Sequence, residues 1–157
     1  MYKRQNSNYV VCNVNYRLLS DNDNTTTLNE IVNDAFGAIL WVKGNVSKYK
    51  GDRTRIVVTG DSAGAHLSAM IVNRGDQLSS EAFSSSSPRF TPSYLPEATS
   101  AEQVAAENGL AVQAAVLSYG AYDLSATGIS DFESMKNPFW WVSGSIARGL
   151  FGNDYNV

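Results

Sequence analysis

Apolar residues change their spacing several times along the 157-residue chain, and these changes predict alternating strands and helices. Short runs rich in β-branched residues indicate buried strands, and apolar positions that recur every three or four residues indicate helices. The expected strands are Val10–Tyr16, Arg55–Thr59 and Ala114–Tyr119, and the expected helices cover about 28–47, 63–71, 101–108 and 137–151. This alternation predicts an α/β fold with a parallel sheet, right-handed crossovers and the Arg55–Thr59 strand at its centre.

Three stretches fall outside this pattern. Residues 74–100 contain four consecutive serines and three of the four prolines, so we expect an excursion loop rather than core. Residues 125–157 include an aromatic helix that either packs its own apolar face in a cap region or lines a substrate pocket. Residues 1–5, Met-Tyr-Lys-Arg-Gln, match the translated end of a transposon-type sequencing adapter. We therefore expect residues 1–5 to be an artefact and 6–157 to be a partial domain.

The composition narrows the possible partners. The net charge is -3 and no basic stripe occurs, which argues against a nucleic-acid partner. No apolar run approaches the length of a membrane span. Cys12 is the single cysteine and lies in the first expected strand, so we expect a small core residue and no disulfide within the chain. Compartment and oligomeric state stay open.

The most specific motif follows the second expected strand directly. Gly60-Asp61-Ser62-Ala63-Gly64 has the Gly-x-Ser-x-Gly spacing of a nucleophile elbow, a strand-turn-helix that presents a serine for acyl transfer. We expect Gly60 and Gly64 to allow strand and helix to approach closely. The N–H of Ala63 is then aimed at a developing oxyanion, and Asp61 has a structural role in the turn.

A serine nucleophile also needs a general base and an acid that orients it. The only histidine, His66, lies one helical turn after Ser62, so we expect it to pack beside the helix with a structural hydrogen bond. Asp123 follows the third expected strand and is a possible acid, although an aspartate there more often caps a turn. The chain therefore carries a nucleophile without a base, so either the protein is not a hydrolase or the chain is not the whole protein.

The motif and its surroundings resemble the α/β-hydrolase superfamily, in particular the esterase group related to hormone-sensitive lipase. The similarity extends from about Val10 to Leu124. It rests on the Gly-Asp-Ser-Ala-Gly elbow together with Asn15-Tyr16-Arg17-Leu18, Asp34, Trp41-Val42-Lys43 and Tyr119-Gly120-Ala121-Tyr122-Asp123-Leu124. The loop after Leu18 lacks the proline-rich continuation usual in this group, and residues 74–100 form a longer connection. Because of these two departures, the substrate preference of this esterase group cannot be assigned to the chain.

The resemblance implies that Ser62 is the nucleophile and that the Ala63 N–H is one oxyanion donor. It also implies an oxyanion loop of His-Gly-Gly type before Val10, and an acid and a base after Val157. The expected function is a serine carboxylic-ester hydrolase that acts on small-molecule esters without metal or organic cofactor. The alternatives are a non-catalytic hydrolase-fold protein that binds a ligand or partner, and a peptidase or acyltransferase that uses the same elbow.

Overall fold

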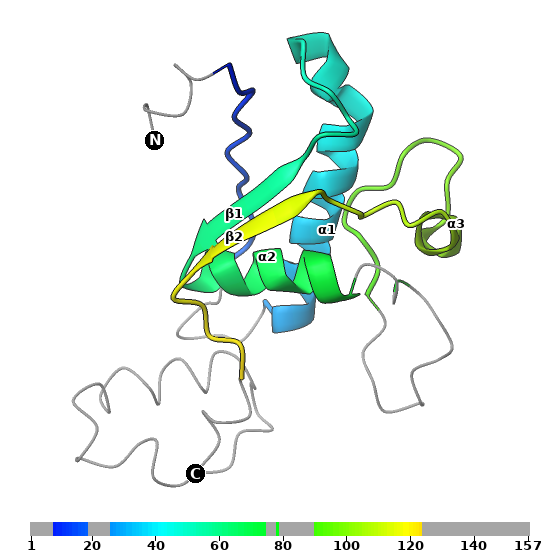
Figure 1. The fold of residues 1–157 in the computed structure, drawn as a ribbon. Helices are drawn as coiled ribbons and strands as arrows, with labels where there is room; N and C mark the ends of the chain where they lie inside the picture. Colours follow the sequence, from blue (N-terminus) through cyan, green and yellow to red (C-terminus); the bar gives the residue numbers. More distant parts are fainter. Residues whose placement is uncertain (1–7, 19–25, 75–77, 79–89, 124–157) are drawn as a thin grey trace, which may run out of the picture.

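The computed structural model describes residues 8–18, 26–74, 78 and 90–123 (Figure 1). Its elements are the helix α1 (Leu28–Asn45), the 3-10 helix η2 (Val46–Tyr49), the strand β1 (Val57–Asp61), the helices α2 (Ala63–Arg74) and α3 (Ala101–Ala106), and the strand β2 (Ala114–Ser118). The predicted adapter residues 1–5, the aromatic helix over 137–151 and the whole cap region 125–157 lie outside the described residues.

The two strands form a parallel sheet, as the alternation of elements predicts. Val57 pairs with Ala114 at one end of the ladder, and Asp61 pairs with Ser118 at the other. β1 begins and ends two residues later than the predicted strand, because the ladder continues into the glycine motif. Strand pairing therefore extends up to the residue that precedes Ser62.

The strand predicted over Val10–Tyr16 is not formed. Residues 8–18 form no strand and pair with no described strand, and Val10 and Val14 are 43% and 39% exposed. A segment at the edge of a sheet gains little apolar burial when no layer covers it, which explains why its apolar pattern alone does not produce a strand. Cys12 is exposed, so its prediction as a core residue is wrong. Among the described residues β1 pairs with β2 alone, and its central place in the sheet stays a prediction.

The long helix α1 begins and ends with defined caps. The Thr27 side chain accepts a hydrogen bond from the Glu30 N–H, and the Glu30 carboxylate accepts one from the Thr27 N–H, which together form a capping box. At the other end the chain tightens into η2, and Lys50 takes a left-handed conformation with φ 65°. The polypeptide can thereby turn back toward β1.

Within the described residues, one face of the sheet is covered by helices and the opposite face is exposed. Val58 of β1 belongs to the main core together with α1 and α2, whereas Val57 and Val116 on the other face are 53% and 54% exposed. The buried residues of this core are Ile31, Val32, Ala35, Phe36, Ile39, Leu40, Val58, Leu67, Ile71, Leu78, Phe90, Ala101, Val104 and Leu110.

The segment 74–100 contributes to this core, which corrects its prediction as an excursion. Leu78 and Phe90 are buried and form an isolated parallel bridge. The ring of Phe90 meets that of Phe36 edge to face, with centroids 5.5 Å apart. Asn33 of α1 accepts hydrogen bonds from the N–H groups of Thr91 and Ser93, at 2.9 Å each. The described part of the segment is thus fixed on α1.

Candidate active site

Ser62 occupies the turn between β1 and α2, where the sequence predicts a nucleophile elbow (Figure 1). Its φ is 52°, in the left-handed region that serine rarely adopts, so the turn is strained and must be held by its surroundings. The Ser62 N–H donates to the Ser118 carbonyl at 3.0 Å, and the Ser62 carbonyl accepts from the N–H groups of Ala65 and His66 at 3.0 and 3.1 Å. These bonds connect the turn to β2 and to α2, which confirms the strand-turn-helix geometry.

Gly60 is required at the elbow because strand and helix touch there. A Cβ on Gly60 would lie 2.2 Å from the carbonyl carbon of Gly64 and 2.7 Å from the nitrogen of Ala65. Gly64 differs from the prediction, since a Cβ at that position would meet nothing within 4 Å. The close approach therefore depends on Gly60, and the second glycine of the motif has no steric explanation among the described residues.

The surface around Ser62 is open. Asp61, Ser62 and Ala63 are all exposed, so a substrate could reach the hydroxyl. The first N–H groups of a helix have no intrahelical acceptor, and in the described part of the chain the N–H of Ala63 donates to no backbone carbonyl. This N–H has the donor capacity that an oxyanion needs.

His66 is bonded away from the nucleophile. Its Nδ1 lies 2.6 Å from the carbonyl oxygen of Ala121, in the segment that follows β2. Because a carbonyl oxygen only accepts, Nδ1 carries the hydrogen in this bond. No hydrogen bond between the side chains of Ser62 and His66 occurs among the described residues, which agrees with the structural role predicted for His66.

Asp123 lies in the exposed segment after β2, five residues beyond the last residue of that strand. It has an interaction partner, so its carboxylate is not free. Its assignment as the acid of the site remains a prediction. Among the described residues no group of three or more histidine, cysteine, aspartate or glutamate side chains could hold a metal ion.

A second polar cluster joins the segment before α1 to the helix. The Arg17 guanidinium binds both carboxylate oxygens of Asp34 at 2.8 Å and one oxygen of Glu30 at 2.8 Å. The hydrogen bond from Arg17 lowers the pKa of Asp34, whose side chain is only 15% exposed. Hydrogen bonds from Thr27 lower the pKa of Glu30, and the Asp34 hydrogen bond raises the pKa of Arg17. Electrostatic pairing therefore holds residue 17 against α1.

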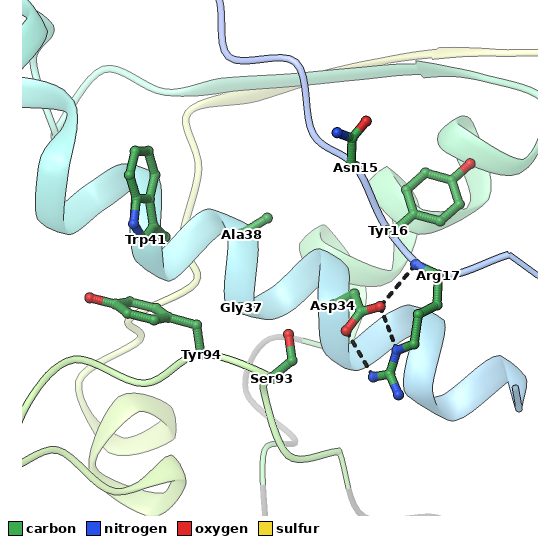
Figure 2. A pocket seen from close by; sticks show the side chains of 9 residues that line it. All are labelled: Asn15, Tyr16, Arg17, Asp34, Gly37, Ala38, Trp41, Ser93 and Tyr94. Atoms are coloured by element: carbon green, nitrogen blue, oxygen red, sulfur yellow. Dashed lines mark hydrogen bonds and ion pairs between the residues drawn. The ribbon is translucent and has the colours of Figure 1, made fainter.

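Beside this cluster lies a groove of about 550 Å³ that the sequence analysis did not predict as a site. Trp41 and Tyr94 stand at one end, and the pair Arg17–Asp34 stands at the other (Figure 2). The remaining lining residues are Asn15, Tyr16, Gly37, Ala38 and Ser93. In the sequence, Arg17, Asp34 and Trp41 contribute only to the family resemblance. No local motif predicts a groove that forms between distant segments.

Comparison with known proteins fits this geometry. The BD-FAE family, whose members are α/β-hydrolases related to hormone-sensitive lipase, has a model that matches residues 1–141. The chain belongs to the BD-FAE family. This membership confirms the predicted esterase group, and the parallel pair β1–β2 packed on α1 and α2 is consistent with an α/β-hydrolase fold.

Curated relatives of this BD-FAE chain include three esterases of Mycobacterium tuberculosis. Esterase LipQ is 36% identical over 106 residues, which cover 68% of the chain and 20% of LipQ. The probable carboxylic ester hydrolase LipM is 36% identical over 59% of the chain and 16% of its own length. Carboxylesterase NlhH is 36% identical over 40% of the chain and 18% of its own length. The matched region thus spans about a fifth of these relatives.

No solved structure matches the chain closely enough for comparison. Among the described residues of this BD-FAE chain, no helix combines the length and apolar character that a membrane crossing requires. The relatives are named as esterases or carboxylic ester hydrolases.

Proposed function

We propose that the protein is a serine carboxylic-ester hydrolase that acts through an acyl-enzyme on Ser62. The observation that carries the proposal is the exposed serine at φ 52° between a parallel strand and a helix. Membership of a hydrolase family and three relatives named as esterases or ester hydrolases support it.

In this mechanism the Ser62 oxygen attacks the ester carbonyl while a general base removes the hydroxyl proton. The N–H of Ala63 donates to the oxyanion of the tetrahedral intermediate. The intermediate collapses, the base returns its proton to the departing alcohol, and an acyl-serine remains. Water, activated by the same base, then releases the carboxylic acid and restores Ser62.

The general base in this proposal is a histidine other than His66, because His66 lies one turn along α2 and makes no hydrogen bond to Ser62 among the described residues. The chain has no second histidine, so the base comes from a longer protein, as does a second oxyanion donor. The acid that orients the base is either Asp123 or a residue of the longer protein outside this chain. The 157-residue chain on its own should then show little turnover, because loss of a triad member can cost about a million-fold.

The full-length protein tests the proposal with a fluorophosphonate probe and a short-chain aryl ester. We expect labelling and hydrolysis in the wild type and the loss of both in Ser62→Ala. Ser47→Ala is the matched control, because Ser47 is also exposed but lies in η2, away from the elbow. Labelling that survives Ser62→Ala would contradict the proposal. A full-length protein that is inert in spite of an intact histidine and acid would favour the non-catalytic binding protein instead.

The same assay separates the remaining alternative. A peptidase or acyltransferase would also be labelled at Ser62, because the probe reports only an activated serine. Turnover of the aryl ester without measurable cleavage of the matching amide, and with water as the acceptor, identifies the ester hydrolase. Measurable cleavage of the amide, or transfer of the acyl group to an added alcohol or amine in place of water, identifies the alternative.

A further inference from the structure

We infer that His66 is a positioning residue of the proposed hydrolase, which fixes the segment leaving β2 against the first turn of α2. This inference rests on the proposed function for its effect on catalysis. The observation behind it is the 2.6 Å bond between Nδ1 of His66 and the carbonyl oxygen of Ala121, which joins residues 55 positions apart in the sequence.

A second bond binds the same two parts of the molecule. The Ser62 N–H donates to the Ser118 carbonyl at 3.0 Å, directly beyond the pair Asp61–Ser118 that ends the ladder. Ser118 ends β2 and Ala121 follows it by three residues, while Ser62 directly precedes α2 and His66 lies in its first turn. The two bonds therefore attach this segment to the elbow at two points.

The segment leaving β2 is exposed and begins with a strained residue. Tyr119 has φ 42°, a strained value for an aromatic residue, and its side chain is 77% exposed. The N–H of Gly120 donates to the Tyr122 hydroxyl at 3.3 Å, which is a contact within the segment. A local contact of this kind cannot fix the segment relative to α2, whereas the bond from His66 can.

The position of this segment matters for acyl transfer. Tyr119 follows Ser118, whose carbonyl is bonded to the N–H of Ser62, so the exposed Tyr119 lies beside the nucleophile. A misplacement of about 1 Å in an active site can cost about 100-fold in rate. Loss of the His66 bond should therefore disturb substrate placement while Ser62 stays in its own turn.

Three substitutions in the full-length protein test this role. In His66→Asn the amide nitrogen occupies the place of Nδ1 and can still donate to Ala121. In His66→Gln the amide lies where Nε2 lies, and His66→Ala has no donor. We expect kcat/KM within about threefold of the wild type for Asn, and a loss of about 10- to 100-fold for Gln and Ala. The Asn and Gln variants both keep a polar amide side chain on α2. A difference in kcat/KM between them therefore reports the position of the hydrogen-bond donor.

The outcomes distinguish positioning from other roles. Equal losses of 10,000-fold or more in all three variants would make His66 the general base and overturn the inference. Unchanged kcat/KM in the Gln and Ala variants, with only a lower melting temperature, would make it a packing residue and would overturn the inference as well. If His66→Asn alone keeps a kcat/KM near that of the wild type, His66 acts as the hydrogen-bond donor to Ala121.

Amide hydrogen exchange provides a readout that does not depend on activity. Exchange over residues 119–122 should accelerate in His66→Ala and His66→Gln and stay near the wild-type rate in His66→Asn. If the wild-type full-length protein shows no esterase activity, the proposed function fails, while this exchange pattern still confirms the restraint. If amide exchange over residues 119–122 is equal in the wild type and the three His66 variants, the inference is overturned, whatever their esterase activity.

Discussion

The contact between strand and helix at Gly60 allows a sharp test of the elbow. In Gly60→Ala the new methyl group would lie 2.2 Å from the carbonyl carbon of Gly64 and 2.3 Å from its oxygen, against an ordinary contact of 3.4–4 Å. The obstacle is backbone, so no side chain can rotate away, and β1 and α2 must separate by about 1 Å. Overpacking of this kind costs about 1–3 kcal/mol. In a domain of about 150–250 residues this lowers the melting temperature by roughly 2–12 °C.

The matched control is Gly64→Ala, which introduces the same methyl group four residues later. Its Cβ meets nothing within 4 Å, and alanine favours a helix over glycine by up to about 1 kcal/mol. We expect Gly64→Ala to melt at or above the wild-type temperature and Gly60→Ala clearly below it, by differential scanning calorimetry of the full-length protein. Fluorophosphonate labelling of Gly60→Ala should also slow, because Ser62 shifts with the helix. The reasoning is refuted if both variants melt alike or if Gly60→Ala is unaffected.

Two further predictions concern the parts of the fold that support the elbow. Asp34→Asn should make the free energy of unfolding less dependent on pH in the acid range. Arg17 lowers the pKa of Asp34 in the folded protein. The ionised carboxylate therefore stabilises the fold above about pH 4, and this stabilisation is lost as the pH falls through the folded-state pKa. Urea unfolding at pH 7 and pH 3 should show a smaller pH dependence in this variant than in the wild type, and an identical dependence would contradict the pairing. Phe90→Ala should lower the free energy of unfolding by about 3–5 kcal/mol, because Phe90 is buried against Phe36. A loss below about 1 kcal/mol would restore the prediction that residues 74–100 form a loop outside the core.

The elements that could be predicted from the sequence are those determined by local signals. The helix α1 follows from its apolar spacing, and the two paired strands follow from short apolar runs. The geometry of the elbow follows from small residues next to a serine, since a sharp turn tolerates nothing larger at Gly60. Each of these signals lies within about 20 residues of the element that it determines.

The predictions that failed depend on residues far apart in the sequence. Val10 and Cys12 have the composition of a buried strand, but burial requires a covering layer that the described residues do not supply. Conversely, Phe90 lies in a polar, serine-rich stretch and is nevertheless buried, because it meets Phe36 more than 50 positions away. Apolar pattern shows which residues can be buried, and tertiary contact decides which of them are.

The same distinction explains why only half of the candidate site could be read from the sequence. The proposed nucleophile Ser62 and the proposed first oxyanion donor Ala63 are adjacent residues, so one motif contains both. A base and its orienting acid reach the hydroxyl from other strands, and no local spacing marks them. The bond between His66 and Ala121 has this non-local character, because it joins the elbow helix to the segment leaving β2. The single histidine of the chain is thus bonded to the segment leaving β2, and in the proposed mechanism the base lies outside these 157 residues.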